Sequence, residues 1–301
     1  MAYRLKREES VSHGVKRLAN KALCSALDGL RPGHPKQRDE AVHEGRKEVK
    51  KARALLELVR DDLGRKYEKD KQRLREAARP LSHERDAKIL LDTFDGLRKR
   101  HRTALRRHTW ADIRRSLDAL AADATRRALR PASITRTLNA LRKTRDNSRS
   151  WSLDAKGFRA LRPGLKRSFK RARKALHRAR AHKTPGNLHR WRKRVKTHWY
   201  HTRMLEASEP RRLDPYLAKL HDLETWLGDL HNLIVLSERI KAGDFPPSMT
   251  EEVARLCSLI EQQQTQLRDK ALALGARVYA ERGRAFVRRL ERFWRAWRAE
   301  S

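Results

Sequence analysis

The sequence predicts an all-α protein built from two related helical bundles. Nearly every stretch between its Pro and Gly residues carries apolar residues at helical spacing. No stretch sustains the alternation of apolar and polar residues that is typical of a strand. A basic segment at residues 41–60 also reappears 146 positions later, at residues 187–206. Self-similarity at a fixed offset indicates a duplicated unit.

The first half of the chain is expected to hold five helices. The first ends at the Arg31-Pro-Gly-His-Pro segment, the third bends near Pro80, and the last starts at Ser133 after Pro131. Their expected ranges are 9–30, 36–62, 65–101, 103–130 and 133–149.

The second half is expected to hold five more helices. Asn187 after Thr-Pro-Gly and Asp214 before Pro215 are the expected starts of two of them, and Phe245-Pro-Pro separates two others. A break of the first at Pro163 stays open. The expected ranges are 154–182, 187–208, 214–242, 249–273 and 276–299.

Two further blocks repeat in the same order as the basic segment. Residues 81–90 align with residues 227–236 at the offset of 146, and Gly14 to Arg17 align with Gly164 to Arg167 at a slightly larger offset. Three ordered blocks predict two homologous helical bundles, residues 1–150 and residues 151–301.

Each copy of the basic segment places its cations on one side of a helix. Offsets of 0, 3, 4 and 7 fall within about one third of the helix circumference. The opposite sides carry apolar residues, such as Val42 and Val49 in one copy and Trp191 and Val195 in the other, which predicts that they are buried. The shared residues are His43, Arg46, Lys47 and Lys50 in the first copy and His189, Arg192, Lys193 and Lys196 in the second.

The composition points to a polyanionic partner. The chain has 301 residues, a formal net charge of +37 and 38% hydrophobic residues, so it is a folded polycation rather than a disordered tail. A charge of this size favours bound anions that relieve self-repulsion. Nucleic acid, an anionic membrane surface and linear polyphosphate are the candidate partners.

Other patterns limit the functional class. Cys24 and Cys257 fit neither a disulfide framework nor a metal site, and no apolar run is long enough for a membrane span or a secretory signal. We therefore expect a cytoplasmic protein without metal or cofactor, and make no prediction of its oligomeric state. Motifs of nucleotide-binding loops, serine hydrolases and zinc proteases are missing from the sequence, which favours a protein that is not an enzyme.

The histidines have more than one interpretation. His43 and His189 have a lysine four residues later, which disfavours a metal site, and the surrounding cations favour a neutral imidazole. A hydrogen-bond donor to phosphate and a structural role at the helix start both stay open. His198 and His201 are expected to serve packing or contact with an anion.

Further cations either extend the cationic stripe or lie on a solvated exterior. Residues three or four apart on a helix are about 5 to 6 Å from one another, so one stripe can contact successive phosphates of a chain. The candidates are Arg53, Lys166, Arg167, Lys170, Arg171, Lys174 and Arg203, together with Lys16, Arg17 and Lys21 on the counterpart helix.

The duplicated helix resembles the signature of the CHAD domain, the conserved histidine α-helical domain. The matching residues are Val42-His43, Arg46-Lys47 and Lys50, and Leu188-His189, Arg192-Lys193 and Lys196. The blocks from Leu81 to Asp86 and from Leu227 to Asn232 strengthen the resemblance, although His231 stands where the first block has Arg85.

The resemblance implies two pseudo-symmetric antiparallel bundles, formed by duplication of a four-helix-bundle unit, with a central basic groove or pore. It also implies binding of inorganic polyphosphate without turnover, with Arg85 among the ligands. The chain has no ExExK motif of a fused triphosphate-tunnel domain, so we expect a stand-alone binding module. A general nucleic-acid-binding protein is the alternative, and otherwise nucleic acid is expected to bind only weakly. Association with polyphosphate granules is a further expectation.

Overall fold

The computed structural model describes residues 3–31, 38–104, 106–128, 131–243 and 247–299; within these ranges, side chains are described except at 38–39, 41, 81–87, 120–121, 123–128, 131 and 247. The described residues form helices joined by short connections and contain no strand. The predicted all-α class is therefore confirmed.

The first half of the chain forms seven of these helices. Ser10 caps the first, since its side chain accepts a hydrogen bond from the backbone N–H of His13. The helices are α1 (Val11–Gly29), α2 (Arg38–Leu58), α3 (Arg60–Leu63), α4 (Arg65–Ala78), α5 (Pro80–Arg100), α6 (Arg107–Ala128) and α7 (Pro131–Arg149).

The described residues of the second half form five helices and two short 3₁₀ turns. The helices are α8 (Phe158–Ala181), α9 (Pro185–Arg203), α10 (Pro210–Lys241), α11 (Thr250–Val278) and α12 (Gly283–Ala299). The turns lie at Glu206–Ser208 and Pro247–Met249. The chain runs helically through Pro163, so α8 has no break there.

Three of the expected helix starts were wrong for one physical reason. Proline occupies the first helical position of α7, α9 and α10, where its missing N–H costs no hydrogen bond and its fixed φ suits the helix. The helices therefore begin at Pro131, Pro185 and Pro210, ahead of the expected Ser133, Asn187 and Asp214. Thr184 is the cap of α9, and its side chain accepts a hydrogen bond from the N–H of Asn187.

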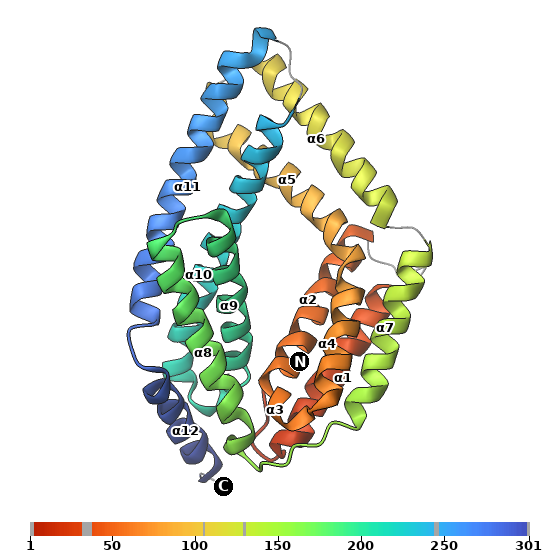
Figure 1. Ribbon diagram of the computed structural model, residues 1–301, viewed down its shortest axis with the longest axis vertical. Helices are drawn as coiled ribbons and strands as arrows, with labels where there is room; N and C mark the ends of the chain where they lie inside the picture. The colour runs from red at the N-terminus through yellow and green to blue at the C-terminus, as the bar shows by residue number, and fades with distance from the viewer. Residues whose placement is uncertain (1–2, 32–37, 105, 129–130, 244–246, 300–301) are drawn as a thin grey trace.

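The helices form a lower body and an upper arm (Figure 1). In the lower body, α1, α2, α4 and α7 lie on one side and α8, α9, the start of α10 and α12 lie on the other. In the upper arm, α5 and α6 converge with α10 and α11. Both ends of the described chain belong to the lower body.

The described residues form two hydrophobic cores, and each contains residues from both halves of the chain. The larger core fills the lower body and includes Leu23 and Leu55 from the first half and Phe169 and Leu220 from the second. The smaller core fills the upper arm, where side chains of α5 and α6 meet those of α10 and α11. The division into bundles at residue 150 stays a prediction.

Corresponding helices make corresponding contacts in the two halves. Helix α1 packs on α2 as α8 packs on α9, and α1 contacts α7 as α8 contacts α12. The halves meet where α2 contacts α8 and α9, and where α5 contacts α10. The two basic helices, α2 and α9, are therefore neighbours.

Candidate functional site

The basic helices α2 and α9 touch through a buried histidine. The Nε2 atom of His201 lies 2.8 Å from the backbone oxygen of Ala54. Glycine at position 164 lets α8 approach the end of α2, since a Cβ atom there would lie 2.0 Å from the oxygen of Leu58. These contacts set the distance between the helices and so the spacing of the cations they carry.

The apolar faces predicted for both helices are confirmed. Val42 and Val49 of α2 are at most 2% exposed, and Trp191 and Val195 of α9 are fully buried. A Cβ atom at Gly275 of α11 would lie 2.5 Å from the Trp191 ring, so α11 covers this side of α9 closely. With one face fixed, each helix turns its cations toward the space between them or toward solvent.

Four of the predicted cations converge from the two helices. Burial, followed by repulsion from Lys196, Arg46 and Arg192, lowers the pKa of Lys50 to about 8. The Lys50 side chain is nevertheless exposed to solvent. The four cations therefore lie close enough together to repel one another.

The carboxylate of Glu224 lies among these cations. Glu224 of α10 accepts a hydrogen bond from Nζ of Lys196 at 2.7 Å and an ion-pair contact from Nη2 of Arg192 at 3.5 Å. Its burial raises its pKa, but Lys196, Arg192 and Lys50 outweigh this effect and lower the pKa overall. A Cβ atom at Gly228 would lie 3.0 Å from Nη2 of Arg192, so this glycine leaves room for the guanidinium.

His189 is held neutral beside this cluster. Its ring centroid lies 4.2 Å from that of His231. Burial, followed by repulsion from His231, Lys193 and Arg192, lowers its pKa to about 4. The neutral imidazole expected from the sequence is therefore the form present at neutral pH, and it can donate a single N–H to an anion.

A second group of cations lies along one flank of α9. Burial, followed by repulsion from Arg53, Arg194 and Arg190, lowers the pKa of Lys193. Arg53 of α2, whose own pKa is lowered by burial and by Arg75, therefore faces α9. Arg190 and Arg194 were not among the predicted site residues; the first copy has Glu44 and Glu48 at these positions.

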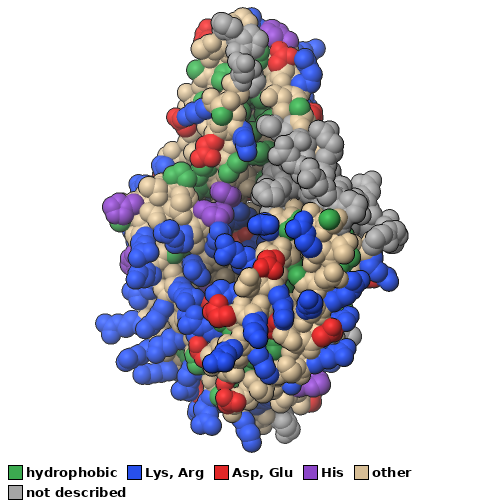
Figure 2. All heavy atoms as spheres, turned by 45° about the vertical axis from the view of Figure 1, so that its right-hand side comes forward, with side chains coloured by type: hydrophobic (Ala, Val, Ile, Leu, Met, Phe, Trp, Pro, Cys, Tyr) green, Lys and Arg blue, Asp and Glu red, His purple; other side chains and the backbone are tan. Residues whose placement is uncertain are grey.

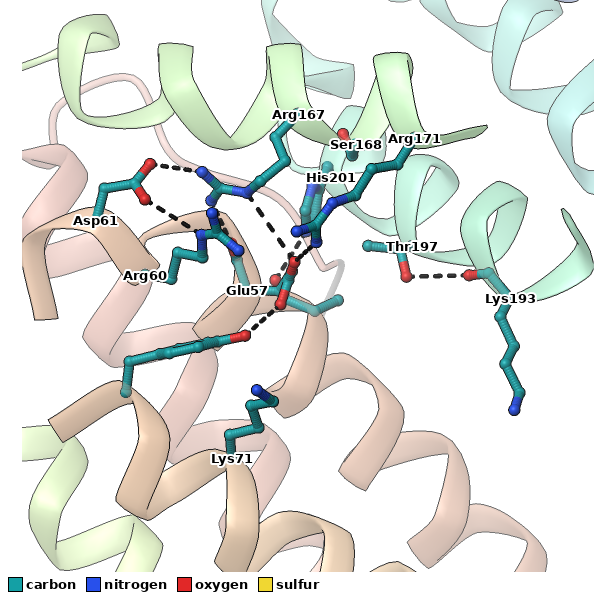
Figure 3. Close-up of polar contacts among 12 residues, drawn as sticks. Glu57, Arg60, Asp61, Lys71, Arg167, Ser168, Arg171, Lys193, Thr197 and His201 are labelled. Carbon is teal, nitrogen blue, oxygen red and sulfur yellow. Dashed lines mark hydrogen bonds and ion pairs between the residues drawn. The ribbon is translucent and has the colours of Figure 1, made fainter. Parts of the chain in front are cut away.

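Arg167 and Arg171 of α8 lie against carboxylates of the first half. Nη1 of Arg167 lies 2.5 Å from the Asp61 carboxylate, and Arg171 donates to the Glu57 carboxylate. Tyr67 donates a third hydrogen bond, to Glu57 at 2.5 Å. Figure 3 shows both arginines reaching from α8 toward Glu57. These cations connect the two halves, and their predicted contact with an anion stays a prediction.

A small pocket lies beside this network. Its walls come from α2, α8 and α9, and Arg194 and Arg171 face it together with Glu57. The remaining lining residues are Gly164, Arg167, Ser168, Thr197 and His201.

The other candidate cations occupy different surroundings. Lys47 pairs with Glu44 at 3.3 Å, the guanidinium of Arg203 lies 5.1 Å from the Trp199 ring centre, and Arg17 pairs with Glu9. Lys16 and Lys21 are half-buried on α1, as is Lys166 on α8, whereas His43, Lys170 and Lys174 are exposed. The side chain of Arg85 lies outside the described residues.

The two remaining histidines of α9 serve packing. His198 is buried, its Nε2 lies 3.0 Å from the hydroxyl of Tyr216, and its ring meets Phe169 edge to face. Burial lowers the pKa of His198 to about 3 and that of His201 to about 4. Both are neutral at physiological pH.

The surface charge is unevenly distributed. In Figure 2, Lys and Arg side chains crowd the lower body, whereas the upper arm shows fewer cations and more hydrophobic atoms. Within the described ranges, no cluster of His, Cys, Asp and Glu side chains is suited to hold a metal ion. None of the helices in the described part of the chain has the length and apolarity that crossing a membrane requires.

Comparison with known proteins identifies the family of this chain. No curated protein matched the chain. The family model of the CHAD domain matches residues 20–241, which include both basic helices, the Glu224 cluster and the pair of His189 and His231. Over most of its length, therefore, this chain belongs to the CHAD domain family.

Proposed function

We propose that this protein binds inorganic polyphosphate, without catalysis, in a cationic groove lined by α2 and α9. The CHAD domain is associated with polyphosphate binding in general. The observation that carries the proposal for this chain is the convergence of Lys50 and Arg46 with Lys196 and Arg192 from the other half.

This convergence is costly without a bound anion. Burial and, after it, like charges lower the pKa of Lys50 to about 8, which raises the free energy of the unliganded protein, and Glu224 offsets only part of the repulsion. A polyanion placed between the helices would relieve it. Binding of a polyanion would therefore lower the electrostatic free energy of the proposed groove.

The residue types suit a flexible, featureless chain of phosphates. Arginine offers a planar fork to phosphate oxygens, whereas lysine acts as a point charge that tolerates several positions. Neutral His189 adds one directional donor beside them. Successive cations on each helix are about 5 to 6 Å apart, which matches about two links of an extended phosphate chain.

A competition titration tests the proposal. Labelled long-chain polyphosphate is bound to the protein at roughly physiological salt and then displaced with unlabelled polyphosphate or with duplex DNA. We expect polyphosphate to displace the label at far lower phosphate concentration than DNA. Equal displacement by both would favour the alternative of a general nucleic-acid-binding protein, and steady release of free phosphate would favour an enzyme.

A variant locates the site. Joint replacement of Arg46, Lys47, Arg192 and Lys193 by Ala removes two cations from each basic helix and leaves their buried faces intact. We expect this variant to keep its helical circular dichroism and its melting transition but to lose binding. Unchanged binding by the folded variant would place the site elsewhere. Recruitment to polyphosphate granules follows from the same proposal and would be lost in parallel.

A further inference from the structure

The two basic helices carry side chains of opposite charge at some equivalent positions. The offset of 146 pairs Glu44 of α2 with Arg190 of α9, and Glu48 with Arg194. It also pairs Arg53 with Trp199. The proposed groove therefore has two unlike flanks, although its central residues are the same in both copies.

One flank is strongly cationic, and we name it the arginine flank. Its side chains lie close enough to affect one another, since Arg53, Arg190 and Arg194 all lower the pKa of Lys193 and Arg75 lowers that of Arg53. Four of the five are exposed, and Arg194 is half-buried and lines the pocket beside Arg171. Its members are Arg53, Arg75, Arg190, Lys193 and Arg194.

The charges of the arginine flank are only partly offset by a nearby carboxylate, since Glu57 favours the charged forms of Arg53 and Arg194 but does not reverse the lowering of their pKa values by burial and like charges. Glu57 is the acidic side chain of the adjoining pocket, and it already accepts hydrogen bonds from Tyr67 and Arg171. None of the five cations forms an ion pair with a carboxylate among the described residues. They are free to exchange water and counterions for phosphate oxygens.

The opposite flank carries its own acids and aromatic rings, and we name it the mixed flank. Glu44 pairs with Lys47 at 3.3 Å, and Glu48 pairs with Lys51. Both acids also lie near Tyr200 of α9, since burial and then Glu224, Glu48 and Glu44 raise the pKa of that phenol. Trp199, in place of an arginine, stacks on His221 with ring centres 5.7 Å apart.

We propose that the arginine flank is the primary subsite for polyphosphate in the groove. The mixed flank binds the polyphosphate chain only weakly where the chain leaves the groove. This inference rests on the proposed function and assigns Arg75, Arg190 and Arg194 to it. A polyanion gains counterion-release free energy on the arginine flank, whereas the lysines of the mixed flank are already paired with Glu44 and Glu48 and offer it less net charge. Short chains should therefore occupy the arginine flank and the groove centre, and only longer ones should extend beyond them.

The test uses three double variants with matched changes. Arg190→Gln with Arg194→Gln removes two cations from the arginine flank. Glu44→Gln with Glu48→Gln removes two anions from the mixed flank. Arg284→Gln with Arg288→Gln removes two exposed cations from α12 and controls for net charge. Affinity for short polyphosphate of defined length is measured over a range of salt concentrations, after circular dichroism has shown that each variant is folded.

We expect the affinity of the arginine-flank variant to fall by at least about tenfold. We also expect its affinity to depend less on salt, because binding would release about one to two fewer counterions, roughly one for each lost contact. The mixed-flank variant and the α12 control should each change affinity by less than about threefold. Equal and opposite effects of the two flank variants, or equal losses in the arginine-flank variant and the control, would overturn the one-sided arrangement. Failure of the unmodified protein to bind polyphosphate would instead overturn the proposed function.

Discussion

His201 of the second half donates its Nε2–H to the backbone oxygen of Ala54 in the first half, at 2.8 Å, and both residues lie in the interior between the basic helices. A backbone oxygen can only accept, so the hydrogen bond fixes the proton on Nε2. Among the described residues, Nδ1 of this ring has no partner. Protonation would therefore place a charge in the core that Glu57 offsets only in part.

This relationship predicts loss of stability in mild acid. Burial lowers the pKa of His201 to about 4 from the ordinary 6.5. As the pH falls below 6.5, the unfolded chain takes up a proton that the folded protein cannot accept until about pH 4. The contribution of the neutral ring is thus complete above pH 6.5 and falls by up to about 3 kcal/mol toward pH 4.

The measurement is the free energy of unfolding in urea between pH 7.5 and pH 4.5. His201→Gln keeps a donor toward Ala54 and cannot ionise, so its stability should depend less on pH than that of the unmodified protein. His177→Gln, at an exposed position of α8, is the control and should leave the pH dependence unchanged. Parallel pH curves for all three proteins would contradict the prediction.

The crossing of α8 and α2 predicts a severe effect of one methyl group. Gly164→Ala would place its Cβ 2.0 Å from the oxygen of Leu58, which is a backbone atom and cannot turn aside. Although alanine favours helix over glycine by about 1 kcal/mol, we expect a net loss of at least about 2 kcal/mol in unfolding free energy.

Gly186→Ala is the matched control, since a Cβ atom there would meet no packed neighbour within 4 Å among the described residues. It should be neutral or stabilise by up to about 1 kcal/mol. Urea unfolding followed by circular dichroism measures both variants. Similar stability of the two would show that α8 and α2 can separate without cost.

The low pKa of Lys50 predicts proton uptake on binding. The free ammonium loses its proton with a pKa of about 8, and a bound polyanion would return the pKa toward that of ordinary lysine. Affinity for polyphosphate should therefore fall as the pH rises from 7 to 9, by up to about tenfold from this residue.

Calorimetry in buffers of different ionisation enthalpy checks this directly. Near pH 8, binding should take up about half a proton per site. Lys50→Arg keeps the charge and does not titrate in this range, so uptake should disappear while binding persists. If the arginine variant took up the same number of protons, another group would be responsible.

The buried faces of the two repeated basic helices could be predicted from the sequence. Burial of Val49 and Trp191 was predicted because apolar spacing on one helix specifies one face. The proximity of α2 and α9 was inferred from duplication and family resemblance. The helix starts failed at Pro131, Pro185 and Pro210, where proline begins a helix rather than precedes one.

The rest of the site depends on contacts between residues that are distant in the sequence. Glu224 lies 28 positions from Lys196, and no local pattern marks it as the partner of that cation. Arg167 and Arg171 looked like an extension of the cationic stripe, but the fold brings α8 against Glu57 and Asp61 of the first half. Arg190 and Arg194 could have been found by comparing where the two copies differ.

The position of Glu224 among the cations predicts that one substitution lowers stability and raises affinity for polyphosphate. Its carboxylate offsets the repulsion among Lys196, Arg192 and Lys50, and a polyanion in the groove would do the same. Glu224→Gln should therefore lower the unfolding free energy by about 1 to 3 kcal/mol and raise polyphosphate affinity by about three- to tenfold. Saturating polyphosphate should restore most of the lost stability, because it replaces the missing negative charge.

Thermal melts with and without polyphosphate measure both sides of this trade, and the matched control is Glu261→Gln, whose ion pair with Lys241 is exposed and remote from the basic helices. That control should change stability by less than about 1 kcal/mol and leave affinity unaltered. If Glu224 competes with the ligand for Lys196 and Arg192, Glu224→Gln should raise the affinity. If Glu224 instead positions these two cations for the ligand, the substitution should lower the affinity. Weaker binding by Glu224→Gln would therefore contradict the prediction.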